Sequence, residues 1–340
     1  MSTVLLARLD SDGDVLVSGP AVRAVAAAGH RVVLLCGPRG AAAARLLPGV
    51  DEVLVWHCPW IDADPTPVDA HDIARLVEDL RSRSLNRALV LTSYHQSPLP
   101  LALVLRLAGV PWVGATSEDF PGSLLDLRHR LPDTGLHEVE RALSLVSAAG
   151  YRSPDPDTAL AVRRPLPDTG ALTGPGAYVV VHPGASVPAR AAGPARMARH
   201  VEALVAAGHR VVVTGGPDET ALTAAVAGQV ALDLGGRTDL AQLADVLDRA
   251  QCVVVGNTGP AHLAAAVGTP VVSLFAPVVP AERWRPWGVA HVLLGDQQEQ
   301  CAFSRARTCP VPGHPCLDGI ASTEVAAAVA TLSPVLEVLA

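Results

Sequence analysis

Short apolar segments rich in β-branched residues alternate along this chain with helix-length amphipathic segments, and this alternation constrains the fold more than any other feature. Strands that alternate with helices form a parallel sheet covered by helices on both faces. In the first half the patterning predicts strands at 3–9, 31–35, 52–55, 88–91 and 111–114, and helices at 15–28, 69–83 and 99–108. The first half is therefore expected to be an α/β domain.

The alternation stops in a stretch rich in Pro, Gly, Asp and Thr, residues 152–176, and then starts again. Such a stretch has too little to bury in a core and is typical of a linker. The restarted pattern predicts strands at 178–181, 210–214, 252–255 and 270–275, and helices at 194–207, 218–227, 240–249, 260–267 and 323–339. We therefore expect two Rossmann-like domains in tandem: an N-terminal domain at 1–160, a linker at 161–176, a C-terminal domain at 177–322 and a closing helix at 323–340.

The charge of the chain argues against nucleic acid or an anionic membrane as its main partner. The formal net charge is -7, and all 26 Lys+Arg positions are arginine. Every apolar run is interrupted by polar residues or proline before it reaches about 18 residues, and the N-terminus enters an apolar segment at once, without a basic region and cleavage site. We expect a cytoplasmic protein without a transmembrane segment.

One strand-to-helix turn has the features of an anion site. After the apolar residues Val253-Val254-Val255 come Gly256-Asn257-Thr258-Gly259-Pro260-Ala261-His262. Proline is favoured at the first position of a helix, and the free N–H groups there attract phosphate. Thr258 and His262 add hydrogen-bonding groups, and Gly259 allows close backbone approach. The alternative is an ordinary capped helix in which His262 only packs.

A second turn has similar features. His182-Pro183-Gly184-Ala185-Ser186 follows the strand at 178–181, and Arg190 comes before the next helix. Both turns lie at carboxyl ends of parallel strands, where ligands bind. Ser186 supplies a hydroxyl and Arg190 a permanent charge that pairs with phosphate oxygens. Two such turns in one domain favour a diphosphate ligand, although a solvated Arg190 is the alternative for this residue.

Other nucleotide motifs are absent from the sequence. A Walker A loop needs a lysine, which the chain lacks, and no G-x-G-x-x-G follows the first strand. Gly215-Gly216-Pro217-Asp218-Glu219 follows another strand of the same domain, and an acidic residue there is suited to ribose hydroxyls. The alternative is that Asp218 and Glu219 only start a helix.

The N-terminal turn carries Asp10, Asp12 and Asp14 around Gly13. A carboxylate at the mouth of a strand can act as a general base when neighbouring acids and partial burial raise its pKa. Capping of the following helix by Asp12 or Asp14 is the structural alternative. The D-x-D spacing also suggests a divalent metal, but the phosphate turns lie in the other domain.

Three motifs, taken in order and spacing, give a resemblance to a known family. Arg8-Leu9-Asp10-Ser11-Asp12-Gly13-Asp14-Val15-Leu16, His182-Pro183-Gly184-Ala185-Ser186 and Asn257-Thr258-Gly259-Pro260-Ala261-His262 resemble those of glycosyltransferase family 9, the heptosyltransferases. The resemblance covers nearly the whole chain. It implies a GT-B fold, in which two Rossmann domains face across a cleft, with the acceptor in the N-terminal domain and a nucleotide-sugar in the C-terminal one.

The resemblance also implies site residues. Asp14 corresponds to the family aspartate that deprotonates the acceptor hydroxyl for inverting attack, and Asp10 is common in the same motif. Asn257 stands where some members have an aspartate, so that charge is missing here. The implied donor-phosphate residues are Ser186, Arg190, Asn257, Thr258, Gly259 and His262, and the implied nucleoside residues are Gly215, Glu219, Thr238 and Leu240.

The acceptor is constrained mainly by charge. Residues 1–150 hold 13 Arg against 17 Asp+Glu, which argues for a small or weakly charged acceptor rather than a polyanion. The expected acceptor wall is an exposed loop at 119–130 together with Tyr94-His95-Gln96, with solvated loop charges as the alternative. The acceptor-binding candidates are Asp10, Gly13, His95, Asp119 and Arg128.

The last cluster contains Cys301, Cys309, Cys316 and His314. The spacing lacks a C-x-x-C knuckle, so we expect structural thiols or a disulfide rather than bound zinc, and no metal or cofactor in the site.

The resulting expectation is an inverting, metal-independent glycosyltransferase that moves a heptose from ADP-heptose to a hydroxyl acceptor. A sugar-nucleotide epimerase of the same fold and a nucleotide-sugar-binding protein without turnover are the alternatives.

Overall fold

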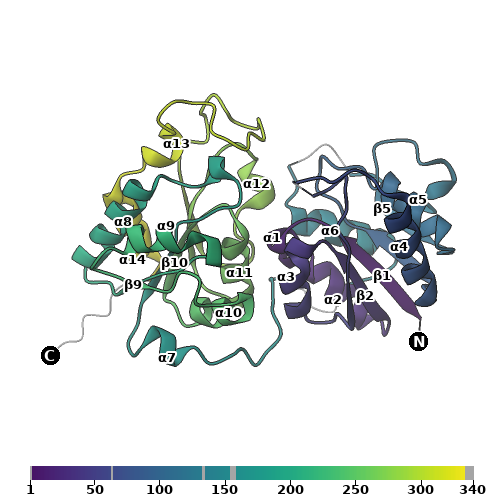
Figure 1. The fold of residues 1–340 in the computed structure, drawn as a ribbon, viewed down its shortest axis with the longest axis horizontal. Coiled ribbons are helices and arrows are strands. Elements are labelled where there is room, and N and C mark those ends of the chain that lie inside the picture. The colour runs from purple at the N-terminus through teal and green to yellow at the C-terminus, as the bar shows by residue number, and fades with distance from the viewer. Residues whose placement is uncertain (1, 63, 132–134, 154–157, 334–340) are drawn as a thin grey trace. The chain divides into compact units, whose positions relative to one another are not determined.

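The computed structural model describes residues 2–62, 64–131, 135–153 and 158–333. The chain divides into two compact units, Met1–Arg163 and Arg164–Ala340, here called unit 1 and unit 2 (Figure 1). Each unit is built around a six-stranded sheet in which every pairing is parallel. The predicted pair of α/β domains with parallel sheets is confirmed.

Unit 1 has the strand order β3-β2-β1-β4-β5-β6. Its strands are β1 (Thr3–Arg8), β2 (Arg31–Cys36), β3 (Glu52–Val55), β4 (Arg87–Val90), β5 (Val113–Thr116) and β6 (Leu127–His129). Its helices are α1 (Asp12–Val17), α2 (Gly19–Ala27), α3 (Ala41–Leu46), α4 (Ala70–Ser82), α5 (Leu99–Leu107) and α6 (Glu138–Ala148), with short 3-10 helices η1 (Pro38–Gly40) and η2 (Gly122–Leu124).

Unit 2 has the strand order β12-β11-β10-β7-β8-β9. Its strands are β7 (Val179–His182), β8 (Val211–Val213), β9 (Leu232–Asp233), β10 (Cys252–Gly256), β11 (Val271–Leu274) and β12 (His291–Leu294). Its helices are α7 (Gly170–Thr173), α8 (Pro194–Ala206), α9 (Thr220–Ala227), α10 (Leu240–Asp248), α11 (Gly259–Val267), α12 (Ala281–Trp284), α13 (Pro315–Asp318) and α14 (Ser322–Leu332), with 3-10 helices η3 (Pro188–Arg190) and η4 (Pro217–Glu219).

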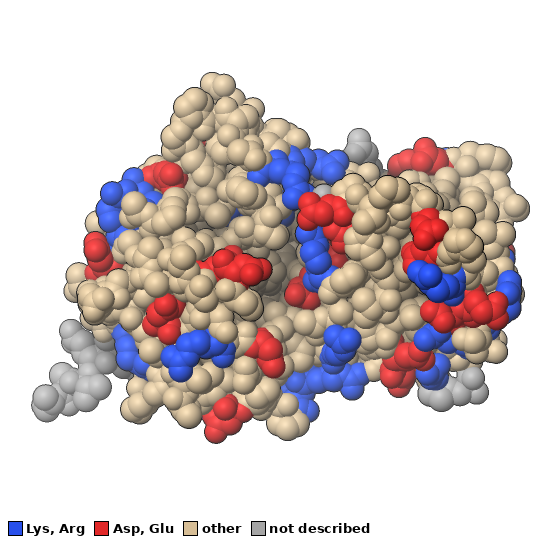
Figure 2. Space-filling model, viewed as in Figure 1, with Lys and Arg blue, Asp and Glu red and all other residues tan. Residues whose placement is uncertain are grey.

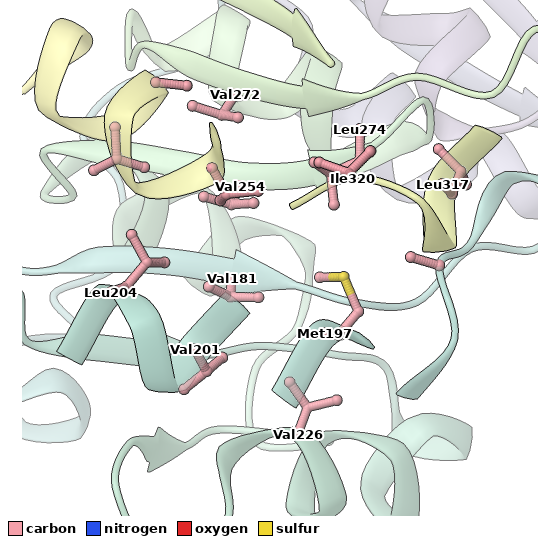
Figure 3. Packing of buried hydrophobic residues seen from close by; sticks show 14 of the residues in the cluster. Val181, Met197, Val201, Leu204, Val226, Val254, Val272, Leu274, Leu317 and Ile320 are labelled. Carbon is pink, nitrogen blue, oxygen red and sulfur yellow. The ribbon is translucent and has the colours of Figure 1, made fainter. Parts of the chain in front are cut away.

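The central strands are valine-rich because helices bury both of their faces. In unit 2, Val181, Val254 and Val272 point from neighbouring strands into one core, where they meet Met197 and Val201 of α8 (Figure 3). Val180, Val253 and Val255 are fully buried as well but lie outside this cluster, as expected for side chains on the opposite face. The sheet is therefore buried on both faces, which leaves the loops after its strands to carry polar groups.

The structure corrects three predicted elements. The helix expected at 15–28 is divided at Ser18 into α1 and α2, because Pro20 lacks an N–H and its ring clashes with the preceding turn of a continuous helix. The loop expected at 119–130 ends in a strand, since Leu127–His129 forms β6 at the edge of the sheet. The closing helix ends at Leu332, and residues 334–340 lie outside the described residues.

Candidate active site

Both sheets have the same topology. The order β3-β2-β1-β4-β5-β6 of unit 1 corresponds to the order β9-β8-β7-β10-β11-β12 of unit 2. The order reverses between β1 and β4 in unit 1 and between β7 and β10 in unit 2. Open parallel sheets bind ligands outside the carboxyl ends of their strands at this reversal. All three sequence motifs named above follow one of these strands, so each unit has one candidate site at its reversal.

In unit 1 the site is organised by Arg8, the last residue of β1, which is 2% exposed. Its Nε lies 2.9 Å from Asp10 Oδ2, and its Nη2 donates to Asp14 Oδ1 at 2.9 Å and to Ser93 Oγ at 2.8 Å. Its Nη1 lies 3.5 Å from Glu138 Oε2, on α6. One buried arginine therefore holds two carboxylates of the turn that follows it and a third from α6, far along the chain.

These contacts separate the acidities of Asp10 and Asp14. Burial by itself raises the pKa of both carboxyls. For Asp14 this effect is outweighed by Arg8 and by the hydroxyl and amide of Ser11, which donate at 2.8 and 3.3 Å, so the pKa lies below its usual range. For Asp10, burial outweighs Arg8, and the charge of Asp14 adds to it, so the pKa rises to about 6.

The three aspartates of the turn have different structural roles. Ser11 is the N-cap residue of α1, and Asp14 receives its hydrogen bonds, so Asp14 also serves the helix start. Asp12 accepts from the amide of Ala43 at 3.0 Å, which ties α1 to α3. Gly13 is buried in the first turn of α1. Asp14 therefore takes part in capping α1, as the structural alternative predicts, and also pairs with Arg8.

Gln96 of the predicted acceptor wall contacts this cluster. Gln96 Nε2, after β4, donates to Asp10 Oδ1 at 2.5 Å. Beside it, the rings of Tyr94 and His95 meet edge to face at 5.2 Å, and His95 is exposed. The segment after β4 therefore lies next to the aspartate turn, as adjacent parallel strands require.

The other predicted acceptor residues follow β5, farther from the reversal. Asp119 is exposed. Arg128 belongs to β6, and its guanidinium donates to the backbone carbonyls of Ser117 and Glu118. Neither side chain has a described contact with Asp10 or Asp14, so the structure brings Gln96 to the aspartates but not Asp119 or Arg128.

In unit 2 the two predicted phosphate turns lie side by side. His182 ends β7 and is in register with Val255 of β10. A Cβ on Gly256 would stand 2.6 Å from the carbonyl oxygen of Arg190, so glycine is needed where the two turns approach. Arg190 is half-buried at the end of η3, and Ser186 is exposed.

The turn after β10 leads into α11 as predicted. Thr258 is the N-cap residue, Gly259 and Pro260 begin the helix, and His262 is 5% exposed. Asn257 Oδ1 accepts from the amide of Ala276 at 3.3 Å. Its buried Nδ2 has no hydrogen-bond partner within the described part of the chain. A buried amide donor of this kind needs an acceptor, which a bound anion would supply.

The neighbouring turn, after β8, brings Glu219 next to the carboxyl end of β7. Glu219 Oε2 accepts from the amide of Gly216 at 2.7 Å and lies 3.9 Å from His182 Nε2. A Cβ on Gly184 would collide with the Glu219 carboxyl group. Glu219 therefore caps η4, as the structural alternative predicts, and at the same time faces the turn after β7.

The remaining nucleoside candidates follow the same edge of the sheet. Gly215 comes after β8, and Thr238 and Leu240 come after β9, next to the α10 N-cap residue Asp239. Because the strand order is β10-β7-β8-β9, the predicted phosphate and nucleoside residues occupy one continuous row of loops.

Several residues of these sites were not predicted. An arginine at the end of the apolar run Leu5-Leu6-Ala7-Arg8 is a signal that Arg8 is buried and paired. His182 is buried, which lowers its pKa against the opposing charge of Glu219, and its Nδ1 is 3.0 Å from Thr214 Oγ1. Glu138 carries no sequence signal, because α6 itself was not predicted.

The cysteine cluster lies in unit 2. All six cysteines are free thiols, so the disulfide alternative is not realised. Cys301 and Cys316 are buried in the unit 2 core, and burial raises the pKa of Cys316 to about 12. Cys309 Sγ donates to the carbonyl of Val311 at 3.4 Å. Within the described ranges, no group of three or more His, Cys, Asp or Glu residues is arranged to hold a metal ion.

Among the helices that the structure describes, none combines the length and the apolar character needed to cross a bilayer.

Comparisons with solved structures support the fold. A glycosyl transferase family 9 protein from Veillonella parvula matches with a TM-score of 0.76 at 16% identity, covering 97% of each chain. The Escherichia coli ADP-heptose LPS heptosyltransferase II matches with a TM-score of 0.73 at 18% identity, covering 98% of each chain. E. coli heptosyltransferase WaaC with ADP matches with a TM-score of 0.70 at 18% identity, covering 97% of this chain and 100% of that one. The chain shares the GT-B fold of these proteins.

Sequence comparisons identify the family. Lipopolysaccharide heptosyltransferase 3 of E. coli is 31% identical over an alignment of 175 residues that covers 47% of this chain. The match spans 50% of that relative, about half its length. The model of glycosyltransferase family 9 (heptosyltransferase) matches residues 73–314, well over half of the chain. The chain therefore belongs to glycosyltransferase family 9.

Proposed function

We propose that this protein transfers a heptose from ADP-heptose to an acceptor hydroxyl, with inversion and without a metal ion. The family and the names of the E. coli relatives support the reaction class and the donor. The observation that carries the proposal is the pair of different sites at equivalent positions: a buried carboxylate cluster on unit 1, and two adjoining amide-rich turns with an arginine on unit 2.

In this proposal the donor diphosphate binds the adjoining turns after β7 and β10. Ser186, Arg190, Thr258 and the unpartnered Nδ2 of Asn257 donate to phosphate oxygens, together with the first amides of α11. Asn257 then supplies a donor where an aspartate would supply a negative charge. Because the row of loops continues past β8 to β9, the ribose lies at Glu219 and the base near Gly215, Thr238 and Leu240.

The acceptor is activated at the carboxylate cluster of unit 1. Asp14, which Arg8 keeps ionised at neutral pH, takes the proton from the acceptor hydroxyl. The acceptor oxygen attacks the anomeric carbon from the face opposite the diphosphate and forms the new C–O bond. The bond from the anomeric carbon to the diphosphate oxygen breaks, and its electron pair leaves with ADP.

The leaving charge is stabilised by groups of unit 2 alone. Helix amides and a guanidinium are already oriented, so they stabilise the departing diphosphate without reorganisation. Arg190 carries a permanent charge and donates two hydrogen bonds to the phosphate oxygens, so it neutralises the charge that a divalent cation would otherwise neutralise. The proposal is therefore metal-independent.

The test is calorimetric titration of ADP, UDP and GDP, with and without Mg²⁺, into the wild type, Arg190→Ala and Arg199→Ala. Arg199 is exposed on α8 and serves as the matched control. We expect ADP to bind best, Mg²⁺ to change little, and only Arg190→Ala to weaken binding, by about tenfold or more. Preference for UDP or GDP would overturn the ADP-heptose assignment, and absence of binding would overturn the nucleotide-sugar site.

Turnover separates the transferase from its alternatives. A transferase releases ADP only as an acceptor is glycosylated, whereas an epimerase needs no acceptor and a binding protein releases nothing. Product formation from ADP-heptose that is independent of any added hydroxyl compound would contradict the proposal.

A further inference from the structure

An irregular segment of unit 2 connects β12 to α13 and forms the protruding loops beside α13 in Figure 1. On the face shown in Figure 2, this protrusion carries few charged side chains. Its residues 303–307 are here called the strap. The side chains of Phe303, Arg305 and Arg307 are exposed, and Ala306 packs against the unit 2 core. The contacts that fix the strap are therefore mainly those of its backbone.

Three backbone hydrogen bonds tie the strap to loops at the carboxyl edge of the sheet. Two of its amides donate to carbonyls after β11, and one of its carbonyls accepts from η3, which follows β7. The pairs, donor first, are Phe303 to Pro277 and Arg305 to Val278, both at 2.8 Å, and Ala189 to Arg307 at 2.9 Å. Because β10 lies between β11 and β7, the strap connects the loops on both sides of the turn after β10.

The partners of the strap lie on buried residues. Val278 and Ala189 are each 1% exposed. A buried peptide group that loses its hydrogen bond has no water to replace the lost partner, so such bonds are strongly retained. The strap is accordingly a fixed part of unit 2 rather than a loose surface loop.

Two strap residues adopt a backbone conformation that is unfavourable for their side chains. The φ angle is 61° at Phe303 and 58° at Arg305, in the left-handed region that favours glycine. These are the two residues whose amides donate to the loop after β11, so the strained conformation and the hydrogen bonds occur together. Strained residues of this kind gather at functional sites, where the surrounding structure holds them in place.

The last contact of the strap reaches the arginine of the phosphate turns. Arg190 directly follows Ala189, whose amide donates to Arg307. The carbonyl oxygen of Arg190 is also the atom that a Cβ on Gly256 would meet at 2.6 Å. The backbone at Arg190 is therefore closely approached by the turn after β10 and lies one residue from the hydrogen bond to the strap. These two contacts limit how η3 can move.

We propose that the strap is a positioning element for Arg190: its backbone fixes η3 and so holds the Arg190 guanidinium ready for the donor diphosphate. This inference rests on the proposed function and adds a positioning residue, Arg305, which acts through its backbone amide rather than its charge. A guanidinium that is already oriented loses less conformational freedom when it binds phosphate, so the donor binds more tightly.

The experiment replaces Arg305 by proline and by glycine and measures ADP binding to the full chain by calorimetry. Arg305→Pro removes the amide that donates to Val278 and is incompatible with the observed φ, because the ring fixes φ near about −65°. Arg305→Gly also loses the guanidinium, but it keeps the amide and adopts the observed φ easily. We expect Arg305→Pro to weaken ADP binding by about tenfold and Arg305→Gly by no more than about twofold.

The matched control is Ser84→Pro in unit 1. Ser84 is exposed, has a φ of 49°, and its amide donates to the carbonyl of Arg81 at 3.1 Å. Proline there creates the same backbone conflict outside the donor site, so ADP affinity should not change. Circular dichroism checks that each variant is folded. Phe303→Pro removes the other strap amide and tests the same prediction if Arg305→Pro does not fold.

A double-mutant cycle shows whether the strap acts through Arg190. In the Arg190→Ala background, Arg305→Pro should weaken ADP binding by no more than about a further twofold, because the guanidinium that the strap positions is gone. A merely structural role would weaken binding equally in both backgrounds. Equal effects in the two backgrounds, equal losses in Arg305→Gly and Arg305→Pro, or no loss in Arg305→Pro would overturn the inference.

ADP binding to the wild type and to Arg190→Ala keeps the two proposals apart. If Arg190→Ala weakens ADP binding and the strap variants do not, the positioning inference fails and the proposed donor site stands. If the wild type does not bind ADP, the proposed function fails, and the positioning inference fails with it.

Discussion

The two units have the same six-stranded order, yet they place opposite chemistry at the same point of the sheet. In unit 1 the reversal between β1 and β4 holds a buried arginine among three carboxylates. In unit 2 the reversal between β7 and β10 holds glycines, a helix N-terminus and Asn257, with one nearby arginine. A parallel sheet thus determines where a ligand binds, whereas the loops determine whether the site moves protons or holds an anion.

The largest effect should come from the arginine that makes unit 1 different. Arg8→Met leaves Asp10, Asp14 and Glu138 buried without their shared counter-charge, which should cost about 3–5 kcal/mol of unfolding free energy. Chemical denaturation measures it. Arg31→Met, which removes a 42% exposed arginine paired with Glu52, should cost at most about 1 kcal/mol. Equal losses in both variants would show that the Arg8 cluster has no special energetic role.

The next effect concerns proton transfer in unit 1. Asp14→Asn should lower kcat by about 10²–10⁴-fold while leaving the affinity for ADP unchanged, because the proposed general base is lost and unit 2 is untouched. Steady-state kinetics and calorimetry measure the two quantities. Asp12→Asn is the control, since an amide oxygen still accepts from Ala43. A similar loss of kcat in both variants would assign Asp14 a structural role only.

A smaller effect is expected in unit 2, where the two phosphate turns approach each other closely through their backbones. Gly256→Ala puts a Cβ against the carbonyl of Arg190 and should separate the two turns, weakening ADP binding by about tenfold, or about 1.4 kcal/mol. Gly170→Ala, at the start of α7, meets only flexible side-chain atoms and should leave the affinity unchanged. Unchanged ADP affinity in Gly256→Ala would place the diphosphate elsewhere.

The smallest effect is in the pH dependence. Because the pKa of Asp10 is raised to about 6, the cluster takes up a proton as the pH falls from 7 to 5, and kcat/KM should fall with it. In Asp10→Asn this protonation is absent, and the fall of kcat/KM at low pH then follows the lower pKa of Asp14. The relative activity of the variant at pH 5.5 should then exceed that of the wild type by about fourfold.

The control for the pH profile is Asp79→Asn, an exposed position on α4. If kcat/KM of Asp10→Asn falls at the same pH as that of the wild type, the titration belongs to another group.

Much of each unit could be predicted from local patterns. The predicted runs 178–181 and 252–255 are apolar throughout because both faces of the sheet are buried, and the structure confirms them as strands β7 and β10. Prediction failed where a local signal was overruled or weak. Pro20 divides a helix whose apolar spacing is continuous, and β6 has only three residues at an edge of the sheet.

The site residues divide in the same way. The sequence alone determined that Asp10, Asp14, Arg190 and Asn257 lie at carboxyl ends of parallel strands, because each directly follows a recognisable strand or its turn. Only the tertiary structure decided that Arg8 gathers carboxylates from α1 and α6, that Gly256 admits the Arg190 backbone, and that Gln96 contacts Asp10. Apart from the contact between Arg8 and Asp14, these contacts join residues far apart in the chain, so their geometry and the resulting pKa shifts depend on packing, which no local pattern encodes.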